Sequence, residues 1–292
     1  MDVPEYAAPA TIEDALRLKN EAGGDAKIIA GGTDLVLKMR ERVFAPTLLI
    51  DLKNVSLDRI TVANDHVCIG AGVTLSQLLA HTEVGHLYPA LIEACQEFAG
   101  PPIRNRGTIG GNIVNASPAA DLIPPLLAYD ARVELASSGS IREVALAEFF
   151  TGPGQTSMTP DEILTDVRLA RMPPATASTF IKLGQRRSMA ISIVSVATRL
   201  TLDEDGRLSA ARVVMGSVAP TPVRAYAAEN SLEGNAPSDD LIKSAANIAS
   251  DEVAPISDVR ASETYRNSMT SVLVRRALLA NIAVLRKRSP SD

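Results

Sequence analysis

The order of the predicted helices and strands changes near residue 170, and this change constrains the fold more than any other feature of the sequence. Before that point, short apolar strands alternate with amphipathic helices; after it, four strand-like segments precede three helical ones. Strands followed by a run of helices are typical of an α+β domain. With 292 residues, the chain is long enough for two domains that meet near residue 170.

Capping residues predict the helices of the first part. Thr11 with Asp14 marks the start of one helix, which we expect to end at a glycine pair, and Thr74 with Gln77 forms a capping box for another. A further amphipathic helix is expected at residues 88–98. Strands are predicted at residues 27–30, 48–52, 67–71 and 131–135.

Residues 103–125 match neither a regular helix nor a disordered chain. The segment has three glycines and three asparagines between isolated apolar residues. Glycine lowers helix propensity, while the apolar residues argue against disorder. We therefore predict a loop that folds over a ligand.

The second part is predicted as a strand meander followed by helices. Residues 203–206 have the composition of a hairpin turn, and we expect the last helix to pack on its own domain. The strands are predicted at residues 162–169, 179–183, 191–202 and 208–218, and the helices at 222–232, 239–250 and 262–287.

Composition excludes several functional classes. The formal net charge of −5 and the pI of about 5.4 argue against nucleic-acid binding, which needs clustered Lys and Arg. No apolar run approaches the roughly 20 residues of a membrane-spanning helix, and the N-terminus has no apolar signal region. We expect a cytoplasmic protein.

The chain has few residues for chemistry of its own. Cys68 and Cys95 are the two cysteines, too few for an iron–sulfur cluster or a four-cysteine zinc site. The three histidines lie within residues 66–86, without an HExxH motif. These scarcities indicate that a bound cofactor supplies the chemistry.

Two glycine pairs are candidates for holding that cofactor. Gly31-Gly32 precedes Thr33, and Gly110-Gly111 precedes Asn112. Glycine lets a ligand approach the backbone, so the two loops could hold the two ends of one pyrophosphate; alternatively, each pair makes only a tight turn. The dinucleotide fingerprint GxGxxG and the Walker A motif are both absent from the sequence, so a dinucleotide would need another scaffold.

Asp121 lies at the end of the apolar, proline-containing segment of residues 116–121. Burying a carboxylate costs free energy unless it is hydrogen-bonded. Its partner could be a sugar hydroxyl of a ligand, or Asp121 could cap the turn that follows it.

Three segments together resemble a known family. Residues 28–35 (IIAGGTDL), 108–112 (TIGGN) and 117–121 (SPAAD) are similar to the FAD-binding (medium) subunit of molybdenum hydroxylases, the family of xanthine dehydrogenase and carbon monoxide dehydrogenase. The resemblance covers nearly the whole chain. It implies an α+β fold: an FAD-binding domain of vanillyl-alcohol-oxidase (PCMH) type with two α+β subdomains at residues 1–172, and a smaller C-terminal domain of antiparallel strands and helices at 173–292, as in the CO dehydrogenase flavoprotein.

The resemblance also implies the residues that bind FAD. Backbone amides of residues 31–35 and 108–112 would hold the pyrophosphate, Asp121 would bind ribityl or ribose hydroxyls, and Ile163 and Leu164 would lie against a ring of the cofactor. For Phe98 a core position, and for Lys27 and Lys182 a solvated charge, are equal alternatives. The implied site residues are Lys27, Ile28, Ile29, Ala30, Gly31, Gly32, Thr33, Asp34, Leu35, Phe98, Thr108, Gly110, Gly111, Asn112, Ser117, Asp121, Ile163, Leu164 and Lys182.

The function implied by the resemblance is electron transfer. FAD would pass electrons from [2Fe–2S] clusters of a small partner subunit to an external acceptor such as NAD, while a large molybdopterin subunit hydroxylates the substrate, in a dimer of heterotrimers. No catalytic side chain and no metal are expected in this chain. Two alternatives are a self-contained flavin-dependent oxidase or dehydrogenase of the same fold, and an assembly protein that has lost FAD.

Overall fold

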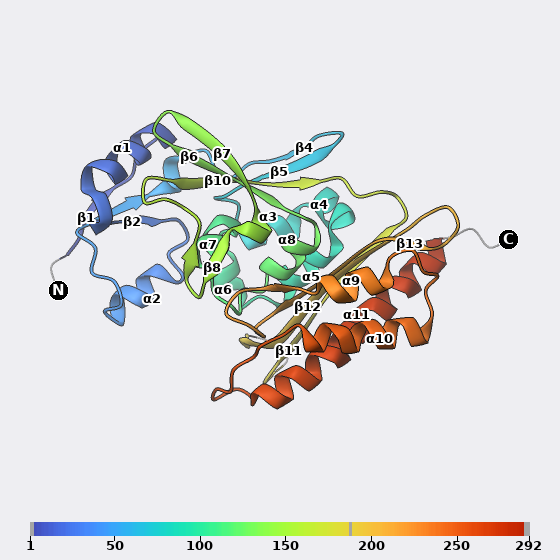
Figure 1. Cartoon of the computed structure of the whole chain (residues 1–292). Helices are drawn as coiled ribbons and strands as arrows, with labels where there is room; N and C mark the ends of the chain where they lie inside the picture. Colours follow the sequence, from blue (N-terminus) through green and yellow to red (C-terminus); the bar gives the residue numbers. More distant parts are fainter. Residues whose placement is uncertain (1–2, 187–188, 289–292) are drawn as a thin grey trace.

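The computed structural model describes residues 3–186 and 189–288, so the outermost residues of both expected domains lie outside the described ones. The chain begins as a small N-terminal lobe at one end of the molecule (Figure 1). Its sheet is parallel, in the order β1 (Glu5–Ala7), β3 (Leu48–Asp51), β2 (Ala26–Ile29). The helices of the lobe are α1 (Ile12–Ala22) and α2 (Leu35–Arg40), with short 3₁₀ turns η1 (Gly23–Asp25) and η2 (Leu52–Asn54).

The N-terminal helix begins where its capping residue predicts. The Asp14 amide donates to Thr11 Oγ1 at 3.1 Å, and the first turn carries two acidic residues that favour the positive end of the helix dipole. Ala15 and Leu16 are buried against the sheet of the lobe. The predicted helix and the two predicted strands, β2 and β3, are therefore confirmed within one residue at each end, whereas β1 and α2 were not predicted.

The second subdomain is built on a five-stranded antiparallel sheet. Its strand order is β4 (Ile60–Val62), β5 (His66–Gly70), β10 (Ile163–Ala170), β6 (Arg132–Ser137), β7 (Ser140–Ala145). Alternate side chains such as Val67, Val133 and Val167 are buried beneath the helices, because side chains of a strand point to opposite faces in turn. The helices of this layer are α3 (Leu75–Ala80), α4 (Thr82–Leu87), α5 (Pro89–Glu97), α6 (Pro101–Arg104), α7 (Ile109–Asn115) and α8 (Ile123–Ala128).

The capping box at Thr74 is confirmed. Its Oγ1 accepts a hydrogen bond from the Gln77 amide at 3.2 Å, and Gln77 Oε1 accepts one from the Thr74 amide at 2.8 Å. Both donors are orphan amides of a helix start, which is why this pair of residues fixes the beginning of α3.

The predicted loop at residues 103–125 is wrong. The segment contains the end of α6, the whole of α7 and the start of α8. Thr108 caps α7, and Gly110 packs against Ala71, where a larger residue does not fit. Close packing and capping therefore outweigh the low helix propensity of glycine here.

The C-terminal domain is an antiparallel meander covered by helices. The sheet runs in the order β11 (Thr176–Gly184), β12 (Ser192–Leu202), β13 (Leu208–Gly216), β14 (Val223–Arg224). The helices α9 (Tyr226–Leu232), α10 (Asp239–Asp251) and α11 (Glu263–Arg288) follow it. The last three predicted strands and the last two helices are confirmed, but the strand expected at residues 162–169 is β10, which belongs to the sheet of the second subdomain and not to the meander. The helix expected at 222–232 begins at Tyr226, because Val223 and Arg224 pair with β13. A hairpin, β8 (Phe150–Gly152) and β9 (Gln155–Thr156), follows the turn η3 (Leu146–Glu148).

The C-terminal sheet is buried on both faces. Phe180, Ala197 and Val214 pack into the core of the second subdomain, while neighbouring side chains such as Val196 and Met215 pack under α10 and α11. Figure 1 shows α10 and α11 on the outer side of this sheet. The second subdomain and the C-terminal domain therefore share buried apolar contacts.

Helix α11 is long and apolar enough to cross a membrane by length and composition, and it is the one such helix among the described residues. Its Asn281 Nδ2 donates to Thr198 Oγ1 at 2.8 Å, and Arg266 Nη1 donates to the Ile193 carbonyl at 2.6 Å. These contacts fix α11 to β12, as expected for a helix that packs on its own domain.

Candidate functional site

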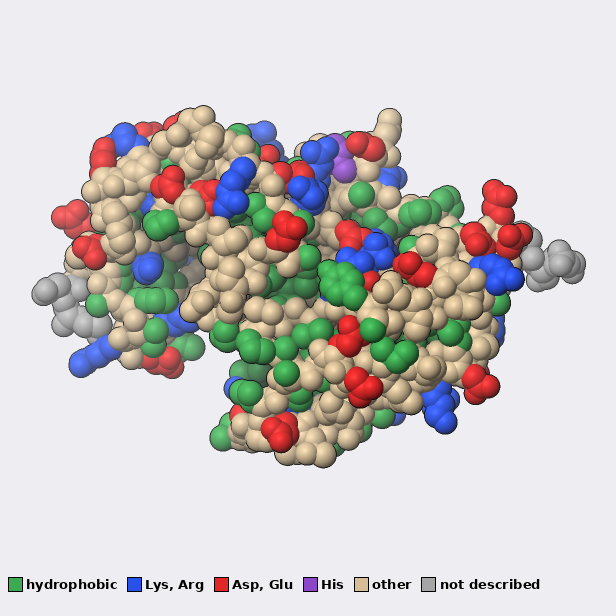
Figure 2. Space-filling model, in the orientation of Figure 1, with side chains coloured by type: hydrophobic (Ala, Val, Ile, Leu, Met, Phe, Trp, Pro, Cys, Tyr) green, Lys and Arg blue, Asp and Glu red, His purple; other side chains and the backbone are tan. Residues whose placement is uncertain are grey.

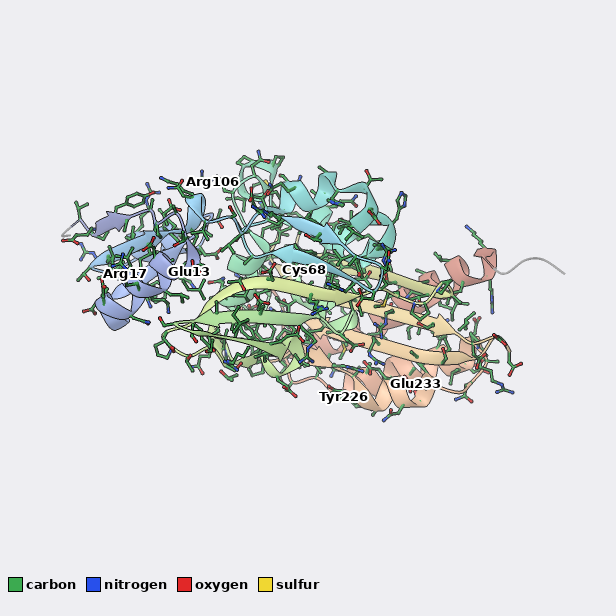
Figure 3. The ribbon with its side chains drawn as sticks, turned by 90° about the horizontal axis from the view of Figure 1, so that it is seen from above. Glu13, Arg17, Cys68, Arg106, Tyr226 and Glu233 are labelled. Carbon is green, nitrogen blue, oxygen red and sulfur yellow. The ribbon has the colours of Figure 1, made fainter. Side chains whose placement is uncertain are left out.

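A cleft of about 630 Å³ lies between the N-terminal lobe and the second subdomain. Figure 2 shows the surface hollowed between these two parts, and Figure 3 shows Arg106 where they meet. The volume lies within the range of about 300–1,000 Å³ that is typical of small-molecule and cofactor sites. Both glycine pairs line the cleft.

The first glycine pair forms the turn between β2 and α2. Gly32 has a φ of +72°, a conformation that other residues adopt with strain. At Gly31 a Cβ would lie 1.9 Å from the carbonyl oxygen of Arg106, so this glycine lets the lobe contact the second subdomain. The two glycines therefore have different roles, one in backbone conformation and one in packing.

Free backbone donors follow this turn. In the described part of the chain, the N–H groups of Gly32, Thr33 and Asp34 donate to no other backbone carbonyl, and Asp34 makes no side-chain cap. They lie at the amino end of α2, where unpaired amides and the helix dipole attract negative charge. This first cradle, residues 31–35, is thus suited to bind a phosphate group.

The second glycine pair lies at the start of α7 and differs from the first. The amide of Gly110 donates to the Ala71 carbonyl at 3.0 Å, and the amide of Gly111 donates to Thr108 Oγ1 at 3.0 Å. A Cβ on Gly110 would lie 2.6 Å from Ala71 Cβ, whereas one on Gly111 would meet Thr108 Oγ1 alone. Gly111 therefore leaves open space toward the cleft, and its amide is already engaged.

This second cradle, residues 108–112, offers side-chain groups to a ligand. Thr108 is almost fully buried and uses its oxygen as the helix cap, which leaves its hydroxyl proton free to donate. Asn112 Oδ1 is a buried acceptor without a partner in the described residues. An unpaired buried polar atom is costly, so a donor on a bound ligand would stabilise the site.

The walls of the cleft combine apolar surface with positive charge. Ile28, Phe98, Ile163 and Leu164 provide apolar side chains, as expected of a site for a ring system. Lysine and arginine outnumber the carboxylates that line it, five to three. The charged residues are Lys19, Lys27, Lys38, Lys53 and Arg106 against Asp34, Asp58 and Glu162.

Glu162 is already paired. It lies at the edge of the cleft, and the Arg142 guanidinium hydrogen-bonds its carboxylate, as does the Thr159 amide at 2.7 Å. The pairing with Arg142 lowers the pKa of Glu162 to about 2. Its negative charge is therefore balanced locally, which leaves the cleft with an excess of positive charge for a diphosphate.

Three expected site residues do not line the cleft: Ser117, Asp121 and Lys182. Lys182 Nζ donates to Asp121 Oδ2 at 2.6 Å, and Ser192 Oγ donates to the other carboxylate oxygen. The ion pair is almost fully buried, and burial raises the pKa of Asp121 while Lys182 acts in the opposite direction. Among the described residues, the Asp121 carboxylate accepts hydrogen bonds from Lys182 and Ser192 and caps no turn.

All other expected residues meet in the one cleft. They are Lys27, Ile28, Ile29, Ala30, Gly31, Gly32, Thr33, Asp34, Leu35, Phe98, Thr108, Gly110, Gly111, Asn112, Ile163 and Leu164. Sequence reasoning missed Lys38, Phe44, Arg106 and Asn115, which also line it. These four stand singly in the chain without a repeated spacing, so no sequence signal marked them.

Comparison with known proteins identifies the class. Residues 2–172 match the family described as FAD binding domain in molybdopterin dehydrogenase, and residues 179–281 match the CO dehydrogenase flavoprotein C-terminal domain. The chain belongs to the family of FAD-binding medium subunits of xanthine dehydrogenase and CO dehydrogenase type, and its cofactor is FAD.

Individual relatives are similar along their whole length. The xanthine dehydrogenase FAD-binding subunit of Escherichia coli O157:H7 is 34% identical over 286 residues, 97% of each chain. The carbon monoxide dehydrogenase medium chain of Hydrogenophaga pseudoflava is 30% identical over 278 residues, 94% of this chain and 96% of that one.

Solved structures agree with this assignment. Carbon monoxide dehydrogenase from Hydrogenophaga pseudoflava, in a form that lacks the Mo-pyranopterin moiety, matches with a TM-score of 0.93 at 32% identity and covers 96% of this chain and 97% of that one. Quinoline 2-oxidoreductase from Pseudomonas putida 86 matches with a TM-score of 0.91 at 28% identity, over 97% and 98% of the chains. The mixed α/β fold expected from the resemblance is confirmed.

Proposed function

We propose that this chain carries electrons from [2Fe–2S] clusters of a small partner subunit through FAD to an external acceptor such as NAD. Hydroxylation of the substrate takes place at the molybdopterin centre of a large subunit, and the assembly is a dimer of heterotrimers in the cytoplasm. Bound flavin accepts electrons singly and releases them in pairs, which connects clusters to a two-electron acceptor.

The observation that carries this proposal is the cleft with two unlike glycine cradles. The free amides of Gly32, Thr33 and Asp34 would bind one end of the diphosphate. The open space at Gly111 would let the other end approach α7, and the Thr108 hydroxyl would donate to it. The residues present thus fit a dinucleotide whose diphosphate carries two negative charges.

The apolar walls would position the rings of the cofactor. Ile163 and Leu164 lie at the start of the central strand β10, where they pair with Ala136 and Leu135 of β6. Side chains on a paired central strand are fixed by the sheet, which gives a rigid surface for a flat ring. Phe98, just after α5, adds aromatic surface on the same cleft.

The side chains of the cleft are suited to binding more than to proton transfer. Of the carboxylates that line it, Glu162 is paired with Arg142 and Asp34 accepts a hydrogen bond from Asn115. The pairing with Arg142 lowers the pKa of Glu162 to about 2, so this carboxylate is a poor proton donor near neutral pH. This arrangement supports an electron-transfer subunit over a self-contained oxidase.

The electron path is tested with the purified complex under anaerobic conditions. NADH is added, and bleaching of the flavin and cluster absorbance is followed. We expect NADH to reduce both centres in the native complex. In a Gly111→Val complex that lacks flavin, NADH should leave the clusters oxidised, while dithionite still reduces them.

The control for this experiment is Gly85→Val, the same substitution in α4 outside the cleft. That complex should behave as the native one. Equal cluster reduction by NADH with and without flavin would refute the proposed path. Substrate turnover by the flavin-loaded single chain, without partners, would show instead that the chain is a self-contained oxidase.

A further inference from the structure

The N-terminal lobe has little apolar contact with the rest of the chain. Within the described residues, its buried cluster includes Ala136 and Ile163 from the second subdomain. The other buried members come from the lobe itself: Ala15, Leu16, Ala26 and Ile50. Since apolar burial is the main stabilising contribution to packing, the position of the lobe depends strongly on a few polar contacts.

One side chain at the cleft, that of Asn115, connects the second subdomain to the N-terminal lobe, both as an acceptor and as a donor of hydrogen bonds. Asn115, the last residue of α7, accepts a hydrogen bond from Lys38 Nζ at 2.6 Å through its Oδ1. Its Nδ2 donates to Asp34 Oδ1 at 3.2 Å. Asp34 and Lys38 lie one turn apart on α2, so a single amide group holds one face of that helix.

The same three residues border the proposed FAD site. Asp34 is the N-cap of α2 and belongs to the first cradle, while Asn115 ends the helix that begins in the second cradle. All three line the cleft. The bridge therefore fixes the distance between the two cradles without touching the core of either part.

We propose that Asp34, Lys38 and Asn115 form a latch that holds the lobe closed over the bound diphosphate and limits the rate of FAD release. This inference rests on the proposed FAD site. Opening of the latch separates the first cradle from α7, and the cofactor then loses one of its two sets of phosphate contacts.

Asparagine is suited to this position because its amide both accepts and donates. Lys38 needs an acceptor and Asp34 needs a donor, and one neutral side chain satisfies both. In the described ranges, Lys38 has no carboxylate within ion-pair distance; its Nζ lies 5.6 Å from the centre of the Phe44 ring. Leucine at this position would leave both charges unbridged, whereas aspartate would bind Lys38 and repel Asp34.

The latch is tested with the full-length chain loaded with FAD. Release is followed as the recovery of flavin fluorescence after dilution, and association is measured by mixing apoprotein with FAD. Asn115→Leu should release FAD at least about tenfold faster, since it removes two hydrogen bonds to charged groups and even one such bond is worth about that factor. Association should be as fast as in the native chain or faster, because the cleft is open.

A damaged fold would give a different result, namely slower association and a lower melting temperature of the apoprotein. Asn115→Asp should release FAD at an intermediate rate. Asn20→Leu is the matched control: it removes a 2.9 Å contact with Ser138 that joins the same two parts outside the cleft.

The outcomes separate the two proposals. A native chain that binds no FAD would refute the proposed function itself. If the native chain binds FAD and Asn115→Leu releases it at the native rate, the latch is refuted while the proposed function stands. Equal acceleration by Asn20→Leu would also overturn the latch, because any contact of the lobe would then have the same effect.

Discussion

Gly111→Val removes the open space at the second cradle and should abolish FAD binding. Gly111 lies in the third position of α7 and is exposed to the cleft. A Cβ placed there lies 2.9 Å from Thr108 Oγ1, and the branched side chain of valine extends beyond it toward the cleft. The phosphate that approaches α7 would be displaced.

The expected loss follows from the contacts removed. If the phosphate loses two hydrogen bonds to its charged oxygens, the cost is about 3–6 kcal/mol, since each contributes about 1.5–3 kcal/mol. That corresponds to an FAD affinity reduced by more than about a hundredfold. The fold should be little affected. The new side chain strains the Thr108 cap at a cost of about 1 kcal/mol. Valine has a slightly higher helix propensity than glycine, which offsets part of that cost.

The assay is titration of apoprotein with FAD, together with the flavin-to-protein ratio after purification. Thermal unfolding of the apoprotein is the measure of the fold, and its midpoint should shift by less than about 4 °C. Gly85→Val is the matched control, because a Cβ there meets only Ile92 Cγ1 at 3.8 Å, an ordinary contact. A Gly111→Val chain that binds FAD with native affinity would refute the placement of the diphosphate beside α7.

Three other substitutions test the surrounding structure. Gly31→Ala should lower the free energy of unfolding by about 2 kcal/mol or more in a denaturant titration, because its Cβ overlaps the Arg106 carbonyl. Lys182→Met should destabilise the chain by about 3–5 kcal/mol in the same assay, since it leaves the buried Asp121 carboxylate without its cationic partner. Glu162 has a pKa lowered to about 2, so its contribution to stability is present above its unfolded pKa of 4.5 and is lost as the pH falls toward 2. Glu162→Gln should remove that part of the pH dependence, and an unchanged profile would contradict it.

Local signals in the sequence predict much of the fold. Thr11 and Thr74 mark the starts of α1 and α3 because a cap uses neighbouring residues alone. The meander β11 to β13 follows from its strand-like segments and the turn at residues 203–206. Where packing between distant segments decides, local signals fail: α7 forms because Thr108 caps it and Gly110 fits against Ala71.

The sequence also predicts part of the site, namely which residues line the cleft, but not what each of them contacts. Both glycine pairs stand out in the sequence, yet the sequence does not distinguish their roles, because the free amides of the first and the engaged amides of the second depend on the folded chain. The pairing of Asp121 with Lys182 joins residues 61 positions apart on different domains. No spacing in the sequence predicts such a contact.

The measurement that tests the central claim most directly is an experimental structure of the FAD-loaded protein. The account predicts the diphosphate within hydrogen-bond distance of the amides of Gly32, Thr33 or Asp34, with its other end above Gly111. A diphosphate that contacts neither glycine cradle, or FAD bound outside the cleft between the lobe and the second subdomain, would contradict it.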